Sequence, residues 1–172
     1  MITGGNSGIG FATACKLAGQ GYHVILASRN QQKSTQAIAR IHSSNPNASV
    51  ESIPLDLASF AAVRQCAAEF HAKGYPLHVL INNAGGSTPG KQASFTADGF
   101  EMTLGTNHLG HFLLTNLLLD DLIRSAPARV ITVSSQLHIP GYGYGPAPDF
   151  DYGNLKGEKY YDPKVFYKNS KL

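Results

Sequence analysis

The chain has 172 residues, of which 42% are hydrophobic, and it carries 14 Lys and Arg against 11 Asp and Glu. This length and apolar content suit one globular domain with a buried core and exclude a disordered or fibrous chain. The net charge of +3 is too small and too scattered for a nucleic-acid-binding or anionic-membrane surface, so we expect a small-molecule partner and no nucleic acid.

The cysteines and the chain start bear on location. Cys15 and Cys66 lie in apolar helical patterns without a CxxC pair or a Cys/His cluster, which favours a reducing compartment over a structural zinc site. No signal peptide follows Met1, and no apolar run reaches the roughly 20 residues that a membrane span needs. We therefore expect a cytoplasmic location, no metal and no membrane span in this chain; segments outside it could still attach the intact protein to a membrane.

Short β-branched runs alternate with longer amphipathic runs, which is the pattern of βαβ units around a parallel sheet. In chain order, the runs predict helices over residues 9–18, 31–42, 60–72 and 99–124, interleaved with strands over residues 23–28, 50–55, 78–82 and 129–134. The expected fold class is therefore α/β, a Rossmann-type doubly wound parallel sheet with helices on both faces, forming a single domain over residues 1–172.

Both ends of the chain look incomplete for such a fold. Only Met1 and Ile2 precede a glycine-rich turn, where a strand of about five residues is expected. The chain also stops at Leu172, inside an expected helix. We therefore interpret the sequence as a fragment and expect the isolated chain to be inactive and poorly stable.

Residues 3–10, with the sequence TGGNSGIG, place glycines where a strand turns sharply into a helix. Such a turn lets a pyrophosphate approach free backbone N–H groups at the positive end of the helix, although a flexible turn without a ligand is the alternative for glycines alone. A P-loop is excluded, because Phe11 follows Gly10 where Lys and Ser or Thr are required. The predicted contacts to the cofactor here are Gly4, Asn6, Ser7, Gly8, Ile9 and Gly10.

The residue that reads the adenosine ribose in a Rossmann site comes about 20 residues after the glycines. Arg29 stands at this distance from Gly10 and follows Ser28 at the end of the next expected strand. A guanidinium offers a fork of donors to a 2′-phosphate, whereas NAD would favour an acidic residue, so we predict NADP in preference to NAD. Lys33, one turn into the following helix, could add positive charge to this site. The alternative interpretation is that Arg29 is a solvated residue at a strand end and binds no cofactor.

The spacing TGxxxGxG resembles the short-chain dehydrogenase/reductase family, and later motifs agree with it in order. Asp56-Leu57 follows the third strand, as the family's adenine contact does, and residues 82–85 (NNAG) match the element in which asparagines join strands below the cofactor. Asn107 and Ser135 stand at the family's positions for active-site polar groups. Within the family, residues 107–118 (NHLGHFLLTNLL) and 157–163 (GEKYYDP) are most similar to the retinol-dehydrogenase-like branch. The resemblance thus adds Asp56, Leu57, Asn83, Ala84 and Gly85 to the predicted cofactor contacts.

The family's chemistry needs a tyrosine and a lysine four residues apart on a helix, where the ammonium can lower the pKa of the phenol. Three pairs have this spacing, namely Tyr152 with Lys156, Tyr160 with Lys164, and Tyr167 with Lys171. The first lies beside Gly153 in a turn-rich segment, and Pro163 interrupts the second. The third has no breaker, follows a proline that could start its helix, and has Ser170 before the lysine. We assign Tyr167 and Lys171 and keep Tyr160 as the alternative.

By this resemblance the protein is an NADP-dependent oxidoreductase that transfers hydride between the nicotinamide and a carbonyl or alcohol carbon. Tyr167 would pass the proton, and Tyr167 and Lys171 would also contact the cofactor. Ser135 would hydrogen-bond the substrate oxygen, and Asn107 would hold a water that connects Lys171 to solvent. The alternative is a dinucleotide-binding regulator or an inactive truncated remnant. Family members often dimerise or tetramerise, so the intact protein is a candidate homo-oligomer.

Residues 136–162 form an insertion rich in Gly, Pro and Tyr, longer than in compact family members. Its aromatic residues Tyr142, Tyr144 and Phe150 would suit a segment that covers an apolar substrate. The alternative is that the insertion is exposed to solvent and has no contact with the substrate. His108 and His111 lie three apart on an expected helix. With no third ligand in the pattern, we interpret them as packing or capping residues rather than metal ligands.

Overall fold

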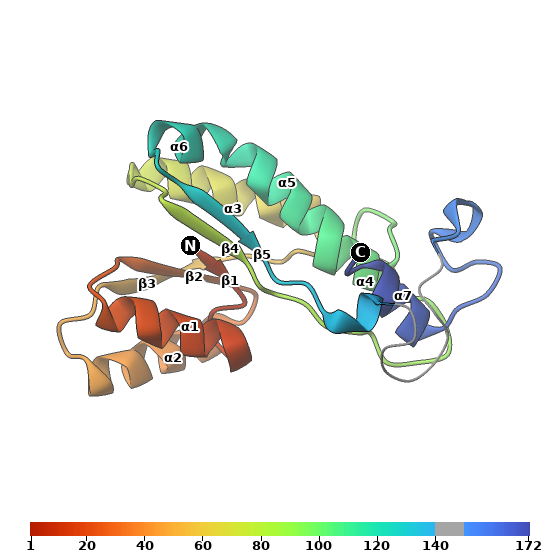
Figure 1. Ribbon diagram of the computed structural model, residues 1–172, viewed down its shortest axis with the longest axis horizontal. Helices are drawn as coiled ribbons and strands as arrows, with labels where there is room; N and C mark the ends of the chain where they lie inside the picture. The colour runs from red at the N-terminus through yellow and green to blue at the C-terminus, as the bar shows by residue number, and fades with distance from the viewer. Residues whose placement is uncertain (140–149) are drawn as a thin grey trace. The chain divides into compact units, whose positions relative to one another are not determined.

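The structure, a computed structural model, describes residues 1–139 and 150–172. Within them, the strands form one parallel sheet with the order β3-β2-β1-β4-β5 (Figure 1). The strands are β1 (Ile2–Thr3), β2 (Val24–Ser28), β3 (Val50–Pro54), β4 (Val79–Asn82) and β5 (Arg129–Thr132). The α-helices are α1 (Gly8–Gly19), α2 (Gln31–Ser44), α3 (Phe60–Lys73), α4 (Met102–Leu104), α5 (Gly110–Leu117), α6 (Leu119–Arg124) and α7 (Pro163–Asn169). Three shorter elements are the π-helix η1 (Gly105–Leu109) and the 3-10 helices η2 (Gln136–His138) and η3 (Tyr152–Asn154).

The chain divides into two compact units. The first unit comprises Met1–Asp56, Ala61–Ala84 and Leu114–Val133, and it contains the sheet. The second unit comprises Leu57–Phe60, Gly85–Leu113 and Ser134–Leu172, and it contains α4, η1 and α7.

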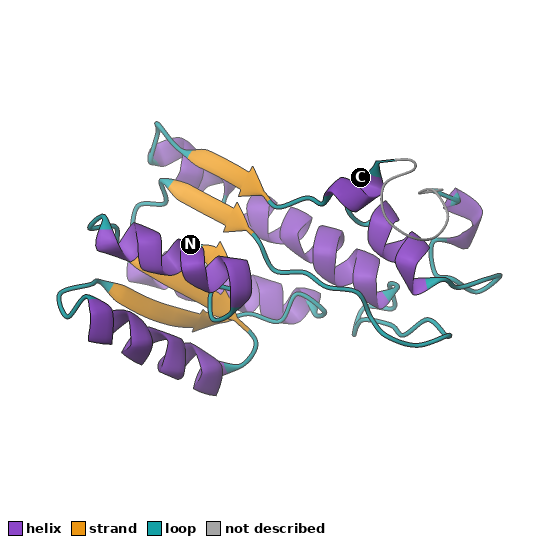
Figure 2. Ribbon diagram, turned by 60° about the horizontal axis from the view of Figure 1, so that its bottom comes forward, coloured by secondary structure: helices purple, strands orange, loops and turns teal. Residues whose placement is uncertain are grey.

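The first unit has the predicted doubly wound architecture. Helices α1 and α2 cover one face of the sheet, and α3 and α6 cover the other (Figures 1 and 2). Because both faces are covered, β2 is buried along its whole length, and its sequence VILAS is apolar without alternation. The side chains that form the core around β1 and β2 are Ile2, Ala14, Ala18, Val24, Leu26, Ala37, Ile41 and Ile81.

The position of β1 determines where a ligand can bind. β1 lies at the centre, with Ile2 in register with Leu26 of β2 on one side and with Ile81 of β4 on the other. The chain runs outward from β1 to β2 and β3, and then crosses back to β4, so the strand order reverses at β1. In open parallel sheets, ligands bind outside the carboxyl ends of the strands at this point of reversal. The glycine turn after Thr3 stands there.

The long helix predicted over residues 99–124 is wrong as a single element. Residues 99–101 precede the helix, and Glu101 caps α4 with its side chain. The helix then passes through the π-helical turn η1 and is interrupted again at Leu118, whose φ of −100° and ψ of 8° are not helical. The apolar pattern continued through both interruptions, and periodicity therefore did not reveal them.

Among the described residues, no helix combines the length and the apolar character needed to cross a membrane.

Candidate active site

The predicted phosphate-binding turn has the backbone that such a turn requires. Gly4 has a φ of +63°, which favours glycine. A Cβ on Gly10 would lie only 2.5 Å from both the Gly4 carbonyl oxygen and Asn83 Nδ2, so the turn has room only for glycine there. Ser7, Gly8 and Ile9 are exposed, and the side chain of Ser7 does not cap α1. The first N–H groups of α1 therefore fit a phosphate, because a helix leaves them without intrahelical partners.

A buried hydroxyl joins the turn to the end of β4. Thr3 Oγ1 accepts hydrogen bonds from the backbone N–H groups of Asn83 and Ala84, each at 2.9 Å. Asn83 Nδ2 donates back to the Thr3 carbonyl oxygen at 2.8 Å. The resemblance predicted that the asparagines join neighbouring strands, and Asn83 joins β4 to β1 in this way. Asn82 instead reaches Thr115 Oγ1, at 3.0 Å.

We expect Thr3→Val to lower the free energy of unfolding by about 1–3 kcal/mol, because at nearly unchanged side-chain volume it removes the acceptor of the Ala84 N–H and leaves the Asn83 N–H with its 3.1 Å bond to the Ile81 carbonyl oxygen. Chemical denaturation monitored by circular dichroism measures this change. Thr3→Ser keeps the hydroxyl and is the matched control. Equal losses in the two variants would mean that the hydroxyl does not hold the turn.

The end of β2 has the residues predicted to read the adenosine ribose. Ser28 is buried, and its Oγ lies 2.6 Å from Ser34 Oγ in the first turn of α2. Asn6 Nδ2 donates to Ser28 Oγ at 3.0 Å and to the Asn30 carbonyl oxygen at 3.2 Å, so the glycine turn is tied to the start of α2. No sequence pattern indicated this tie, because a Ser or Asn in a turn commonly bonds only to its own neighbours.

Around that buried cluster, the two predicted cations face solvent. Arg29 directly follows β2, Lys33 lies in the first turn of α2, and both side chains are exposed. Asn30 caps α2 by accepting a hydrogen bond from the Lys33 N–H at 2.9 Å. This end of the first unit therefore fits a phosphate group. The predicted adenine contact follows β3: Asp56 is half-buried, and Leu57 is buried in the second unit.

In the second unit, Asn107 is the centre of a polar cluster. It lies in η1 and is buried, and its Nδ2 donates to the Gly86 carbonyl oxygen and to Ser170 Oγ, both at 2.9 Å. Its Oδ1 accepts from the Gly86 N–H at 3.0 Å. A Cβ on Gly85 would lie 3.0 Å from Asn107 Oδ1 and 3.1 Å from Lys171 Nζ. Three predicted site residues, Gly85, Asn107 and Lys171, thus lie together.

The predicted Tyr/Lys pair lies on α7 and just beyond it. As expected, α7 begins at Pro163, which occupies its first turn. It ends at Asn169, earlier than predicted, so Lys171 belongs to the following turn, where its N–H bonds to the Lys168 carbonyl oxygen at 3.0 Å. Lys171 Nζ nevertheless lies 5.9 Å from the centre of the Tyr167 ring. Burial lowers the pKa of Lys171.

The predicted serine, Ser135, has a less direct connection to this pair. Ser135 caps η2, because its Oγ accepts from the Leu137 N–H at 3.3 Å. Its neighbour Ser134 bonds to the end of the Tyr/Lys segment, with Oγ donating to the Lys171 carbonyl oxygen at 2.7 Å. η2 itself packs against α7. The structure therefore brings residues 134–138 to α7, and it shows a direct hydrogen bond to this segment for Ser134.

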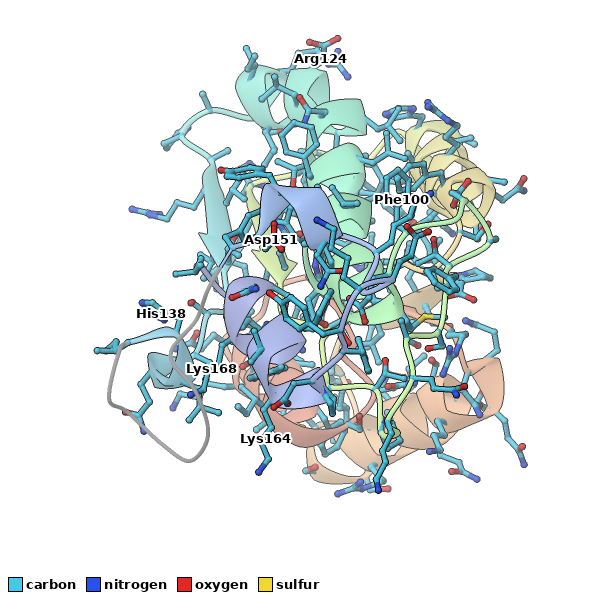
Figure 3. All side chains as sticks on the ribbon, turned by 90° about the vertical axis from the view of Figure 1, so that its right-hand side faces the viewer. Phe100, Arg124, His138, Asp151, Lys164 and Lys168 are labelled. Atoms are coloured by element: carbon cyan, nitrogen blue, oxygen red, sulfur yellow. The ribbon has the colours of Figure 1, made fainter. Side chains whose placement is uncertain are left out.

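The alternative tyrosines differ from Tyr167 in exposure. Tyr152 is 81% exposed in η3, and Tyr160 is 47% exposed and precedes α7, whereas Tyr167 is half-buried. Lys164 points away from α7 (Figure 3). Of the aromatic residues expected to roof the site, Phe150 packs edge-on against Tyr152 at 5.1 Å between ring centres. Tyr142 and Tyr144 lie outside the described residues.

The two histidines of the long helical region have different surroundings. His108 is exposed and stacks on Phe112, with ring centres 6.3 Å apart. His111 is buried, and its Nδ1 lies 2.9 Å from the Asn107 carbonyl oxygen. Burial lowers the pKa of His111 from 6.5 to about 4. Over residues 1–139 and 150–172, no group of three or more His, Cys, Asp or Glu side chains is arranged to hold a metal ion.

His111 makes stability depend on pH. Between pH 6.5 and about 4 the unfolded chain carries a proton on His111 that the folded protein does not, so stability falls as the pH falls through this range. The loss attributable to His111 approaches roughly 3 kcal/mol at the acid end. Urea unfolding at several pH values measures it. His111→Gln keeps an N–H donor but does not titrate, so its stability should fall less steeply; parallel profiles for the two proteins would contradict this assignment.

Comparison with known proteins identifies the family of the chain. The family model described as short chain dehydrogenase matches residues 1–146. The chain belongs to this family. It is 43% identical to human polyprenol dehydrogenase over 176 residues and 44% identical to human retinol dehydrogenase 11 over 172 residues, covering all of this chain and 51% of each relative. Thus the chain spans about half the length of these relatives.

A solved structure is also similar to this chain. The NADP complex of RhlG from Pseudomonas aeruginosa is 31% identical to this chain, with a TM-score of 0.72, over 91% of this chain and 60% of that one. The Rossmann-type fold and the retinol-dehydrogenase-like resemblance inferred from the sequence are therefore confirmed.

Proposed function

We propose that this chain is the cofactor-binding and catalytic part of an NADP-dependent oxidoreductase that interconverts an apolar alcohol and its carbonyl compound. The observation that carries the proposal is the cluster of Gly85, Asn107 and Lys171 beside Tyr167, in a chain that also has the glycine turn of the family. A regulator that only binds a dinucleotide would need the turn but not this cluster.

The first unit would hold the dinucleotide. The glycine turn and the N-terminus of α1 suit the pyrophosphate, and Asp56 suits the adenine amine. Arg29, which directly follows the buried Ser28, and Lys33, in the first turn of α2, are exposed cations, and they would bind a 2′-phosphate. The related RhlG structure is a complex with NADP, which supports this choice. The bound cofactor would supply or accept the hydride at its nicotinamide.

The second unit would handle the proton. Tyr167 would donate its hydroxyl proton to the substrate oxygen during reduction and take it back during oxidation. To do this at neutral pH, the phenol needs a neighbouring group that stabilises its deprotonated form. A protonated Lys171 favours the phenolate, because opposite charges stabilise each other. Ser135 would hydrogen-bond the substrate oxygen, and Asn107 would hold the water that reaches Lys171.

The substrate class rests on the relatives and on the aromatic content of residues 136–162. The names of the two curated relatives specify a polyprenol and retinol, both of which are long apolar alcohols. Phe150 and Tyr152 are aromatic side chains of this insertion within the described residues. We therefore favour an apolar or ring-bearing alcohol over a sugar or a charged metabolite.

The test is oxidation of NADPH by the full-length protein with a panel of aldehydes and ketones of increasing apolar length. We expect turnover with NADPH in preference to NADH, and a kcat/KM that rises with apolar length. Tight NADPH binding without turnover on any member of the panel would instead favour the dinucleotide-binding regulator.

A further inference from the structure

Two carboxylates cap the helices that carry the proposed catalytic residues. Glu101 is fully buried, and its carboxylate accepts from the N–H groups of Thr103 at 2.9 Å and Leu104 at 2.7 Å, at the start of the helical run that contains Asn107. Asp162 accepts from the Lys164 N–H at 2.8 Å, at the start of α7. A carboxylate at a helix N-terminus is favourable both as a hydrogen-bond acceptor and through the helix dipole.

Tyr161 connects these two helix starts. It directly precedes the cap Asp162, and its hydroxyl donates to Glu101 Oε1 at 3.2 Å. Its ring packs on Phe166 in α7, with 4.9 Å between the ring centres. Burial raises the pKa of Tyr161, and the Glu101 carboxylate raises it further, so the phenol stays protonated and remains a donor. The segment before α7 is thus attached to the cap of the other helix.

A second connection lies further along the same two elements. Asn107 Nδ2 donates to Ser170 Oγ at 2.9 Å, and Ser170 Oγ donates to the Tyr167 carbonyl oxygen at 2.8 Å. α4 also packs against α7. Two separate polar links therefore hold one helical run against the other, and two points of attachment restrict a helix's rotation more than one does.

We propose that Tyr161 and Glu101 are positioning residues, which fix the helix of Tyr167 and Lys171 relative to that of Asn107. This inference rests on the proposed function, because it assigns the link a role in proton transfer. Neither side chain is among the groups to which the proposed function assigns the proton or the substrate oxygen. Displacement of a reacting group by about 1 Å can cost up to 100-fold in rate, so a link at the helix ends has a measurable effect on turnover.

Two tyrosine-to-phenylalanine variants of the full-length protein test the link. Tyr161→Phe removes the hydroxyl that reaches Glu101 and leaves the Glu101 cap intact. Tyr22→Phe removes a hydroxyl in the same chemical way at a position that is 50% exposed and for which the described residues show no side-chain hydrogen bond, and it serves as the control. We expect Tyr161→Phe to lower kcat roughly tenfold per NADPH-binding site, with the Kd for NADPH within about twofold of wild type.

The pH profile of kcat separates positioning from simple loss of folded protein. Less well placed proton-transfer groups would move the pH profile of kcat in Tyr161→Phe, whereas a smaller folded fraction would scale the whole profile without moving it. Hydrogen exchange is the readout independent of activity. The amides of α4 and α7 should exchange faster in Tyr161→Phe than in Tyr22→Phe, because the cross-link no longer restrains them.

The possible outcomes decide between the two claims. Wild-type kcat and an unmoved pH profile in Tyr161→Phe would overturn the positioning role while leaving the proposed function intact. A scaled but unmoved profile would also overturn it, in favour of a purely structural role. Failure of the wild-type protein to turn over any substrate would overturn the proposed function and the catalytic role of the link together, and hydrogen exchange would then report only a structural link.

Discussion

Tyr167→Phe in the full-length protein is expected to lower kcat by about 10²–10⁴-fold, which is the usual contribution of a general acid or base. Phenylalanine keeps the ring beside Lys171 but has no proton to give to the substrate oxygen. Binding of NADPH should change little, because most of the proposed dinucleotide contacts belong to the glycine turn and the end of β2. Steady-state kinetics at saturating NADPH, together with a binding titration, measure both quantities.

Tyr160→Phe is the control for this variant, since Tyr160 was the remaining alternative in the sequence. Its hydroxyl is removed in the same chemical way, but the side chain is 47% exposed and precedes α7. We expect it to keep kcat within about twofold of wild type. A large loss in Tyr160→Phe with normal turnover in Tyr167→Phe would exchange the two assignments.

Arg29→Asp is expected to weaken NADPH binding about 10- to 100-fold, because it replaces charge-assisted hydrogen bonds to the 2′-phosphate by repulsion. NADH has a hydroxyl in place of that phosphate, and aspartate can accept a hydrogen bond from it. The affinity for NADH should therefore stay the same or improve. Fluorescence titration with both cofactors gives the ratio of the two dissociation constants.

Arg64→Asp makes the same change of charge at an exposed position of α3 and controls for a general effect of net charge. We expect it to leave the preference between the cofactors unchanged. If Arg29→Asp also left the ratio of the NADPH and NADH dissociation constants unchanged, then Arg29 would not contact the 2′-phosphate. It would then be a solvated residue at a strand end, and the preference for NADP over NAD would have no support from this position.

Local patterns predicted the framework of this fold. The four strands expected from β-branched runs are present as β2, β3, β4 and β5, with ends that differ by a few residues. The turn after Thr3 was predictable, because a strand that turns sharply into a helix needs the backbone freedom of glycine. The start of α7 was also predictable, since proline fixes φ in the first turn and Asp162 is a good cap.

The rest depended on partners that are distant in the chain. Glu101 and Tyr161 are 60 positions apart, and nothing near either residue indicates the hydrogen bond between them. The π-helix at Asn107 likewise follows from the packing around it, because its sequence, GTNHL, continues an ordinary helical run. The assignments of Ser135, Tyr167 and Lys171 as reacting groups stay predictions that experiment must test.

Deuterium transfer tests the central claim most directly. The full-length protein is incubated with an apolar aldehyde and with NADPH that carries deuterium at C4 of the nicotinamide, one stereoisomer at a time, and the mass of the alcohol product is measured by mass spectrometry. We predict that one of the two isomers transfers its deuterium to the carbinol carbon, and that Tyr167→Phe loses nearly all of this product. Alcohol formed without deuterium from either isomer, or formed equally well by Tyr167→Phe, would contradict it.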